Sequence, residues 1–256
     1  MKFQVIGCSG GQVPGSYLSS YLVNDNLLID AGSTTAVLDL EQQQKISNIL
    51  ITHVHLDHIL SLATMADNLF GRCNGTINVW GHPEVTGSLK SSFFNDSIWP
   101  DFSRMTSDEQ PQPVITFRDM TDEKPTTIGD SRVTMVQVNH VVTSTAFFIE
   151  SKGQTLLHVG DTGPTERVWS MCHSKSNLCG VVLEASFPNR MQELADLSRH
   201  LTPRTLAVEI EKLKNPSTPI LVTHLKPQYR DEIVQELKKL GGGRLRVLSE
   251  GDSIDL

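Results

Sequence analysis

Four side chains that can bind a metal ion lie within six residues of one another, directly after a strongly apolar run. The run is Ile49-Leu50-Ile51, typical of a buried strand, and the side chains that follow belong to His53, His55, Asp57 and His58. Imidazole and carboxylate groups together suit zinc and its neighbours among the first-row transition metals. A structural role for all four at once is the weaker interpretation, so the stretch predicts a metal site at a strand end.

Three more residues of ligand type each follow another run that predicts a strand. They are His140, Asp161 and His224. Taken alone, each has a simpler interpretation, because a histidine at a strand end is more often structural and an aspartate before Thr-Gly usually forms a turn or caps a helix. Their common position at strand ends favours a single site that they share with the first four.

The order of the predicted elements indicates a layered α/β fold with helices on the outside. Apolar and β-branched runs bounded by turn residues predict strands at 2–7, 19–24, 27–31, 46–52, 114–118, 132–139, 144–151, 154–160, 180–185, 219–223 and 244–248. Helices are predicted at 35–43, 83–94, 203–214 and 229–240, and a hairpin turn at Asp25-Asn26. No Pro/Gly linker divides the chain.

Length, charge and hydropathy argue against several classes of protein. The chain of 256 residues is long enough to bury a sizeable core, and its net charge of −7 argues against a dedicated nucleic-acid binder. No apolar stretch approaches the ~20 residues that span a bilayer, and the sequence enters a strand at Lys2 without a secretion signal. We read the scattered Cys8, Cys73, Cys172 and Cys179 as reduced thiols, and we expect a cytoplasmic protein.

The order of these ligands resembles the signature of the metallo-β-lactamase superfamily, across nearly the whole chain. The resemblance implies a four-layer αββα fold, one metallohydrolase domain over residues 1–256, and two divalent ions, with zinc expected first and manganese or iron as alternatives. Two such ions can share a hydroxide that attacks an electrophile. Seven residues match the superfamily's ligands: His53, His55 and His140 for the first ion, Asp57, His58 and His224 for the second, and Asp161 as the bridge.

Finer resemblance indicates the branch of the superfamily. Five stretches resemble class II 3′,5′-cyclic-nucleotide phosphodiesterases: IGCSGG at 6–11, HVHLDHILSL at 53–62, NDSIWPDF at 95–102, EASFP at 184–188 and RHLTP at 199–203. The resemblance implies hydrolysis of cyclic AMP or cyclic GMP to the 5′-monophosphate, with the cyclic nucleotide as a small-molecule partner. The glycine-rich stretch lacks the Lys-Ser/Thr of a Walker loop, so we interpret it as a tight turn beside the cleft.

The same resemblance implies catalytic roles beyond the ligands. His200 would donate a proton to the leaving alkoxide, with Glu184 orienting it, and Asp57 is counted with them as catalytic as well as among the ligands. The simpler interpretation of His200 is a surface histidine that caps the following helix. Trp99 and Phe102 either stack on the base or ribose or are buried.

Three other functions share parts of this pattern. A ribonuclease Z-like tRNA 3′ endonuclease would need a protruding basic arm, which we do not find in the sequence. Thioester and lactone hydrolases share the whole ligand set, and a non-catalytic scaffold would be expected to have lost ligands. We therefore expect neither a nucleic acid nor a membrane as partner, and a homodimer is one possible assembly.

Overall fold

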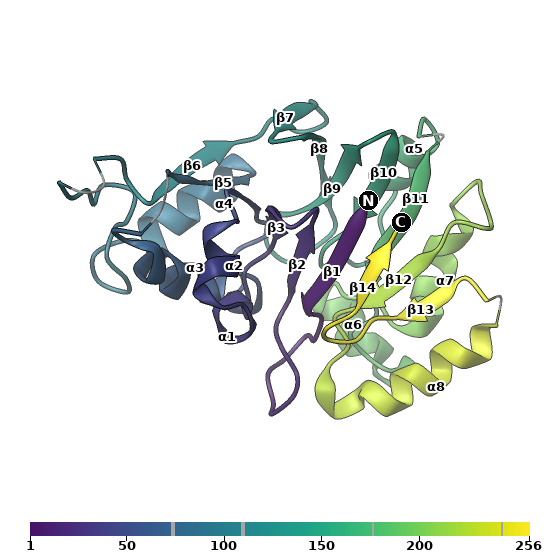
Figure 1. Cartoon of the computed structure of the whole chain (residues 1–256). Coiled ribbons are helices and arrows are strands. Elements are labelled where there is room, and N and C mark those ends of the chain that lie inside the picture. The colour runs from purple at the N-terminus through teal and green to yellow at the C-terminus, as the bar shows by residue number, and fades with distance from the viewer. Residues whose placement is uncertain (73–74, 109–110, 176, 242) are drawn as a thin grey trace.

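Two seven-stranded sheets face each other in the computed structural model (Figure 1). One sheet has the order β14-β1-β2-β3-β4-β5-β6 and the other β13-β12-β11-β10-β9-β8-β7. The residues that the structure describes are 1–72, 75–108, 111–175, 177–241 and 243–256. Of the four cysteines, Cys73 lies outside the described residues, and the other three are free thiols.

The strands of the first sheet are β1 (Lys2–Gly7), β2 (Ser20–Val23), β3 (Leu27–Ile29), β4 (Asn48–Leu50), β5 (Ile77–Gly81), β6 (Ile115–Asp119) and β14 (Ser253–Asp255). Those of the second are β7 (Thr126–Ile128), β8 (Ser131–Val138), β9 (Ser144–Ser151), β10 (Gln154–His158), β11 (Leu178–Glu184), β12 (Ile220–Thr223) and β13 (Leu245–Val247). Neither β5, β7 nor β14 was among the predicted strands.

Most central strands run parallel, which brings their carboxyl ends to one edge. β3, β4, β5 and β6 pair in parallel in the first sheet, as do β10, β11, β12 and β13 in the second. β8 and β10 are both antiparallel to β9, so they point the same way. The ends of β8, β10 and β12 therefore meet at the same edge, where Thr145 of β9 donates from its backbone to the carbonyl of Thr52 after β4.

Alternation along the strands explains the layers. In β3, Leu27 and Ile29 face the core between the sheets, whereas Leu28 faces the helices on the outside. In β11, Val182 faces the inner core and its two neighbours face the other helical layer. Strands buried on both faces appear in sequence as continuous apolar runs, which is why they were predicted. The predicted four-layer αββα fold is confirmed.

The helices form the two outer layers. Packed on the first sheet are α1 (Thr34–Val37), α2 (Leu40–Gln44), α3 (Leu56–Leu69) and α4 (Pro83–Ser88), which continues as the π-helix η1 (Leu89–Phe93). On the second sheet lie α5 (Arg167–Cys172), α7 (Pro203–Glu211) and α8 (Arg230–Leu240), while α6 (Gln192–Ser198) leads into the residues before α7. Within the described residues, none of these helices combines the length and the apolarity that crossing a bilayer requires.

One local prediction was wrong and another was confirmed with a longer loop. The single helix expected at 35–43 is two short helices, because Leu38 is extended and Asp39 caps a new helix in a capping box with Gln42. The hairpin predicted at Asp25-Asn26 is confirmed between β2 and β3, and its loop between the paired Val23 and Leu27 also includes Asn24. Asn24 and Asp25 both have positive φ angles, of 49° and 65°, which a type I′ turn requires at its two central residues.

A buried carboxylate ties α5 to α7. Glu209, 1% exposed, accepts hydrogen bonds from Trp169 Nε1 at 2.6 Å and from the Thr165 amide at 3.2 Å, and Lys212 pairs with it at 2.7 Å. A buried acceptor that serves two donors and a cation is costly to remove, since all three lose their partner.

We expect Glu209→Ala to lower the free energy of unfolding by about 3–5 kcal/mol, because it leaves the Trp169 and Thr165 donors buried without an acceptor. Denaturant unfolding followed by circular dichroism measures the change. Glu211→Ala on the same helix is the matched control, since Glu211 is exposed and a surface substitution changes stability by about 0.5 kcal/mol or less. Equal effects of the two substitutions would contradict the role of Glu209.

Candidate metal centre

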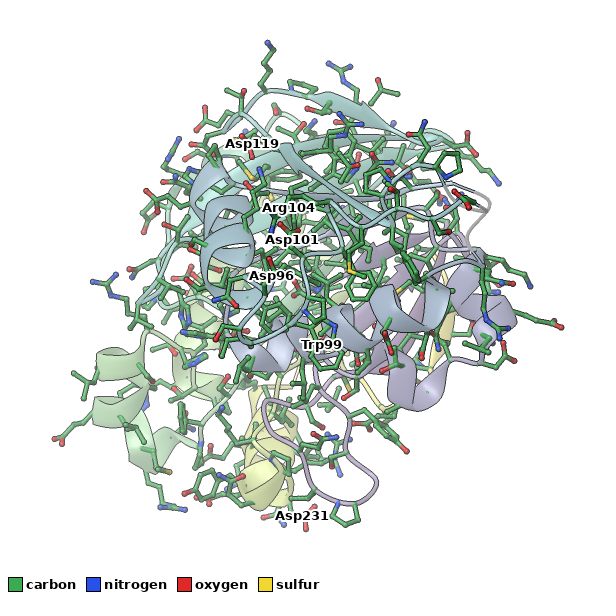
Figure 2. All side chains as sticks on the ribbon, turned by 90° about the vertical axis from the view of Figure 1, so that its left-hand side faces the viewer. Asp96, Trp99, Asp101, Arg104, Asp119 and Asp231 are labelled. Carbon is green, nitrogen blue, oxygen red and sulfur yellow. The ribbon has the colours of Figure 1, made fainter. Side chains whose placement is uncertain are left out.

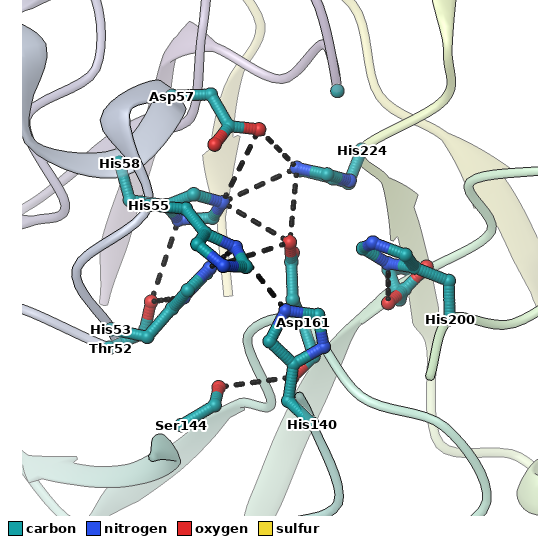
Figure 3. Close-up of polar contacts among 12 residues, drawn as sticks. Thr52, His53, His55, Asp57, His58, His140, Ser144, Asp161, His200 and His224 are labelled. Atoms are coloured by element: carbon teal, nitrogen blue, oxygen red, sulfur yellow. Dashed lines mark hydrogen bonds and ion pairs between the residues drawn. The ribbon is translucent and has the colours of Figure 1, made fainter. Parts of the chain in front are cut away.

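The structure brings all seven predicted ligand residues together at the carboxyl edge of the two sheets (Figure 3). They form two groups in which the ligand atoms lie within 4.8 Å of one another. The first group is His53, His55 and His140, and the second is Asp57, His58, Asp161 and His224. Either group could hold a metal ion.

The spacing of the ligand atoms fits metal coordination. In the first group, His55 Nδ1 lies 3.0 Å from His53 Nε2 and 3.3 Å from His140 Nε2. In the second, His224 Nε2 lies 3.3 Å from His58 Nε2 and 3.2 Å from Asp57 Oδ2. Two ligands of a tetrahedral zinc ion at bond lengths of about 2.1 Å are about 3.4 Å apart.

Asp161 stands between the groups. Its Oδ2 atom lies 3.7 Å from His53 Nε2 in the first group, and 3.3 Å from both His58 Nε2 and His224 Nε2 in the second. The side chain is buried, and it follows β10 through the left-handed Gly160. One carboxylate oxygen therefore faces both positions, as a bridging ligand would.

Hydrogen bonds behind the rings decide which nitrogen faces inward. His58 Nδ1 lies 2.7 Å from the acceptor-only carboxylate of Asp30, and His140 Nδ1 lies 3.0 Å from the carbonyl of Arg199. Each Nδ1 must therefore carry the hydrogen, which leaves the lone pair on Nε2 pointing at the centre. The Nε2 atoms of these two rings thus face the other candidate ligand atoms. This set of imidazole and carboxylate ligands fits bound metal cations.

Electrostatics of the centre agree with that fit. Burial opposes ionisation of Asp161, but His224 and His58 outweigh it and hold the pKa of its carboxyl well below the usual range. Burial likewise opposes a charged His58, yet Asp161 and Asp30 raise its pKa well above the usual value. Burial and the neighbouring His58 lower the pKa of His53. The centre keeps its carboxylates ionised and attracts positive charge.

The elements around the site explain these positions. His55 is the N-cap residue of α3, and Asp57 lies in its first turn, where the partial positive charge of a helix N-terminus stabilises a carboxylate. His58 follows in the same turn, and its backbone carbonyl accepts from Ala31 after β3. The predicted motif therefore spans a strand end, a loop and a helix start.

One residue behind the centre, Asp30, was missed by the sequence analysis. Asp30 is fully buried at the end of β3, and it accepts from His58 and from the backbone and hydroxyl of Thr52. Such a carboxylate behind a ligand histidine fixes the ring and raises its basicity. The signal was available, because Asp30 follows an apolar strand just as the predicted ligands do.

The predicted pair His200 and Glu184 lies beside the centre, where Figure 3 labels His200. His200 Nδ1 is 2.7 Å from Glu184 Oε1, and the His200 ring centroid is 5.0 Å from that of His140 and 5.7 Å from that of His224. Burial disfavours a charged ring, but Glu184 outweighs it and raises the pKa of His200 to about 9. The simpler interpretation, a surface histidine capping a helix, is wrong: His200 is buried and Thr202 is the N-cap residue of α7.

The glycine-rich stretch at 6–11 packs against His224, one of the predicted ligands. A Cβ atom on Gly10 would lie 2.7 Å from both Nδ1 and the carbonyl oxygen of His224. His224 itself has a φ of 60°, unusual for a residue with a side chain, and its amide donates to the Cys8 carbonyl at 2.7 Å. The strained backbone and the missing side chain together place the His224 ring.

We expect Gly10→Ala to weaken the binding of one zinc ion by about tenfold or more, because the new methyl group displaces the His224 ring. Zinc retained after dialysis against a buffered zinc solution, measured by elemental analysis, tests this. Gly87→Ala in α4 is the control, since a Cβ there meets no atom within 4 Å. Unchanged zinc retention in Gly10→Ala would show that the contact does not position His224.

The segment 95–102 forms ion pairs with Arg104, which follows it in the chain. Arg104 pairs with Asp96 and Asp101, each at 2.6 Å, and the three side chains lie close to one another in Figure 2. Phe102 is 2% exposed and packs edge-on against Phe70. Of the two roles considered for Phe102, burial is the one observed, so its ring is not available to stack on a nucleotide. Trp99 is partly buried against the same core.

Comparison with known proteins places the chain among phosphodiesterases. The model of the class-II cAMP phosphodiesterases matches residues 30–250. A relative named as a probable 3′,5′-cyclic-nucleotide phosphodiesterase, from Yersinia pestis, is 28% identical over an alignment of 295 residues that covers 93% of this chain and 82% of the relative.

Solved structures share the fold. Unliganded yeast PDE1 has a TM-score of 0.82 at 20% identity, covering 100% of this chain and 99% of that one. The metallo-β-lactamase fold protein YhfI from Bacillus subtilis has a TM-score of 0.74 at 20% identity, covering 99% and 98% of the two chains. The resemblance to this fold expected from the sequence is confirmed.

Proposed function

The chain belongs to the class-II cAMP phosphodiesterase family, and we propose that it hydrolyses 3′,5′-cyclic nucleotides, cyclic AMP or cyclic GMP, to 5′-monophosphates. The observation that carries the proposal is the buried His200–Glu184 pair, which lies directly beside seven converging metal ligands. Ligands alone would suit any hydrolase of this fold. A proton donor next to them suits a reaction whose leaving group is a poor one, such as the ribose 3′ oxygen.

The residues of the centre would hold two divalent ions, zinc first with manganese or iron as alternatives. His53, His55 and His140 would bind one, Asp57, His58 and His224 the other, and Asp161 would contact both. Bound ions would supply a water of lowered pKa as nucleophile and neutralise charge on the phosphate. Asp57 and Asp161 also give the site its negative charge, which retains the cations.

His200 would act on the leaving group. Its Nδ1 donates to Glu184, so the ring is oriented and Nε2 is left for the substrate. Entering and leaving oxygens lie roughly in line in phosphoryl transfer, so the donor must stand away from the attacking water. Protonation of the 3′ oxygen there would release the 5′-monophosphate. The cytoplasmic location and the homodimer stay predictions.

We expect purified protein loaded with zinc to convert cyclic AMP or cyclic GMP into the 5′-monophosphate, since His200 protonates the 3′ oxygen in this arrangement. Chromatography against authentic 3′- and 5′-monophosphates identifies the product. A 3′-monophosphate would contradict the assigned geometry. Turnover of a tRNA precursor, a thioester or a lactone in place of both nucleotides would assign the chain to another function.

We expect His200→Ala to slow hydrolysis of the cyclic nucleotide by ~10²–10⁴-fold while leaving the bound metal in place, the usual contribution of a general acid. Bis(p-nitrophenyl) phosphate should be affected far less, because its leaving group needs no proton. His173→Ala is the control, since His173 is exposed and contacts the Lys212 carbonyl. Equal losses on both substrates would exclude His200 as the proton donor.

A further inference from the structure

The carboxylate of Glu184 collects hydrogen bonds from several segments of the site. Oε1 accepts from His200 Nδ1 at 2.7 Å and from the amide of Thr162, next to the bridging aspartate, at 2.9 Å. Oε2 accepts from the hydroxyl of Ser186 at 2.5 Å, and from the amides of Ser186 and Leu201 at 3.2 Å each. Glu184 is 1% exposed, so these donors fix it in one position.

Ser186 connects Glu184 to His224, one of the proposed metal ligands. The hydroxyl has a single hydrogen, and Glu184 Oε2 at 2.5 Å is an acceptor that takes it. The Ser186 oxygen also lies 2.9 Å from His224 Nδ1, and toward this ring it can only accept. His224 must therefore carry its hydrogen on Nδ1. Its lone pair is then fixed on Nε2, the nitrogen that faces Asp57 and Asp161.

Other candidate ligands are held by groups other than Ser186. His140 is held by the carbonyl of Arg199 at 3.0 Å, and His53 Nδ1 contacts the hydroxyl of Thr52 at 3.0 Å. In the second group, His58 is held by Asp30. Among the described ligands, the contact with Ser186 belongs to His224, so a change at Ser186 should reach one metal position and the proton donor, not the whole centre.

We propose that Ser186 is a positioning residue that joins the proton donor to the second metal position. Through Glu184 it shares the anchor of His200, and through its own oxygen it sets the tautomer of His224. The proposal rests on the function proposed above, because it takes His224 as a metal ligand. A substitution of Ser186 should therefore change both the affinity for the second ion and the orientation of His200. The affinity for the first ion should stay the same.

Competition of zinc against a chromogenic chelator tests this without any nucleotide. The wild type should bind two equivalents. In Ser186→Ala, one equivalent should weaken about 10- to 100-fold, the usual effect of losing such a supporting contact, and the other should be unchanged. Ser186→Thr keeps the hydroxyl and should restore the weakened equivalent. Should Ser186→Ala not fold, Ser186→Cys keeps the size with a poor acceptor and should weaken the same equivalent.

The control is Ser151→Ala, which removes another buried serine hydroxyl, one that contacts Asn24 far from the ligands. It should leave both equivalents unchanged. Equal weakening of both equivalents in Ser186→Ala, no weakening of either, or the same loss in Ser151→Ala would overturn the proposal. Selective weakening in a protein that hydrolyses no cyclic nucleotide would uphold Ser186 as positioning His224 and overturn only the proposed function.

Discussion

Imidazole nitrogens and carboxylate oxygens that could bind a metal ion converge at one edge of this fold, and the rest of the site depends on that constraint. Asp57 and Asp161 contribute carboxylate oxygens, and the histidine rings turn lone pairs toward the same small volume. Without positive charge the carboxylates of such a cluster repel one another. The pKa of the buried His58 is raised for the same reason, because a charged ring is attracted to Asp161 and Asp30. Every contact behind the ligands acts to keep the cluster in this arrangement.

The scaffold supplies the arrangement by simple means. Parallel strands end at a common edge, so residues just after β4, β8, β10 and β12 become neighbours although they are far apart in the chain. Positive φ angles occur at two residues that orient a histidine ring of the site. They are 60° at His224 itself and 56° at Asp30, whose carboxylate holds the ring of His58. The His200–Glu184 pair, for which we propose the catalytic role, lies at the same edge, since Glu184 ends β11 between β10 and β12.

Sequence reasoning found what has a local signal. The layered fold and the seven candidate ligands follow from apolar runs that end in ligand-type residues, and the family resemblance supplied His200 as the candidate proton donor. It could not find Ser186, whose partner His224 is 38 residues away, nor the carbonyl of Arg199, because a backbone group carries no residue-type signal. The region 35–43 was mispredicted since a capping residue, Asp39, competes with continuation of the helix.

The ligands come from both sheets, and this has a consequence for the life of the protein in a cell. An ion held between the β4–α3 segment and the ends of β8, β10 and β12 is a crosslink that the unfolded chain lacks. By mass action, free ion at about 100 times its dissociation constant adds about 2.7 kcal/mol to the folded state. Abundance of the enzyme would then follow metal supply. Starvation for the ion would expose the chain to proteases and remove the protein itself, beyond silencing its catalysis.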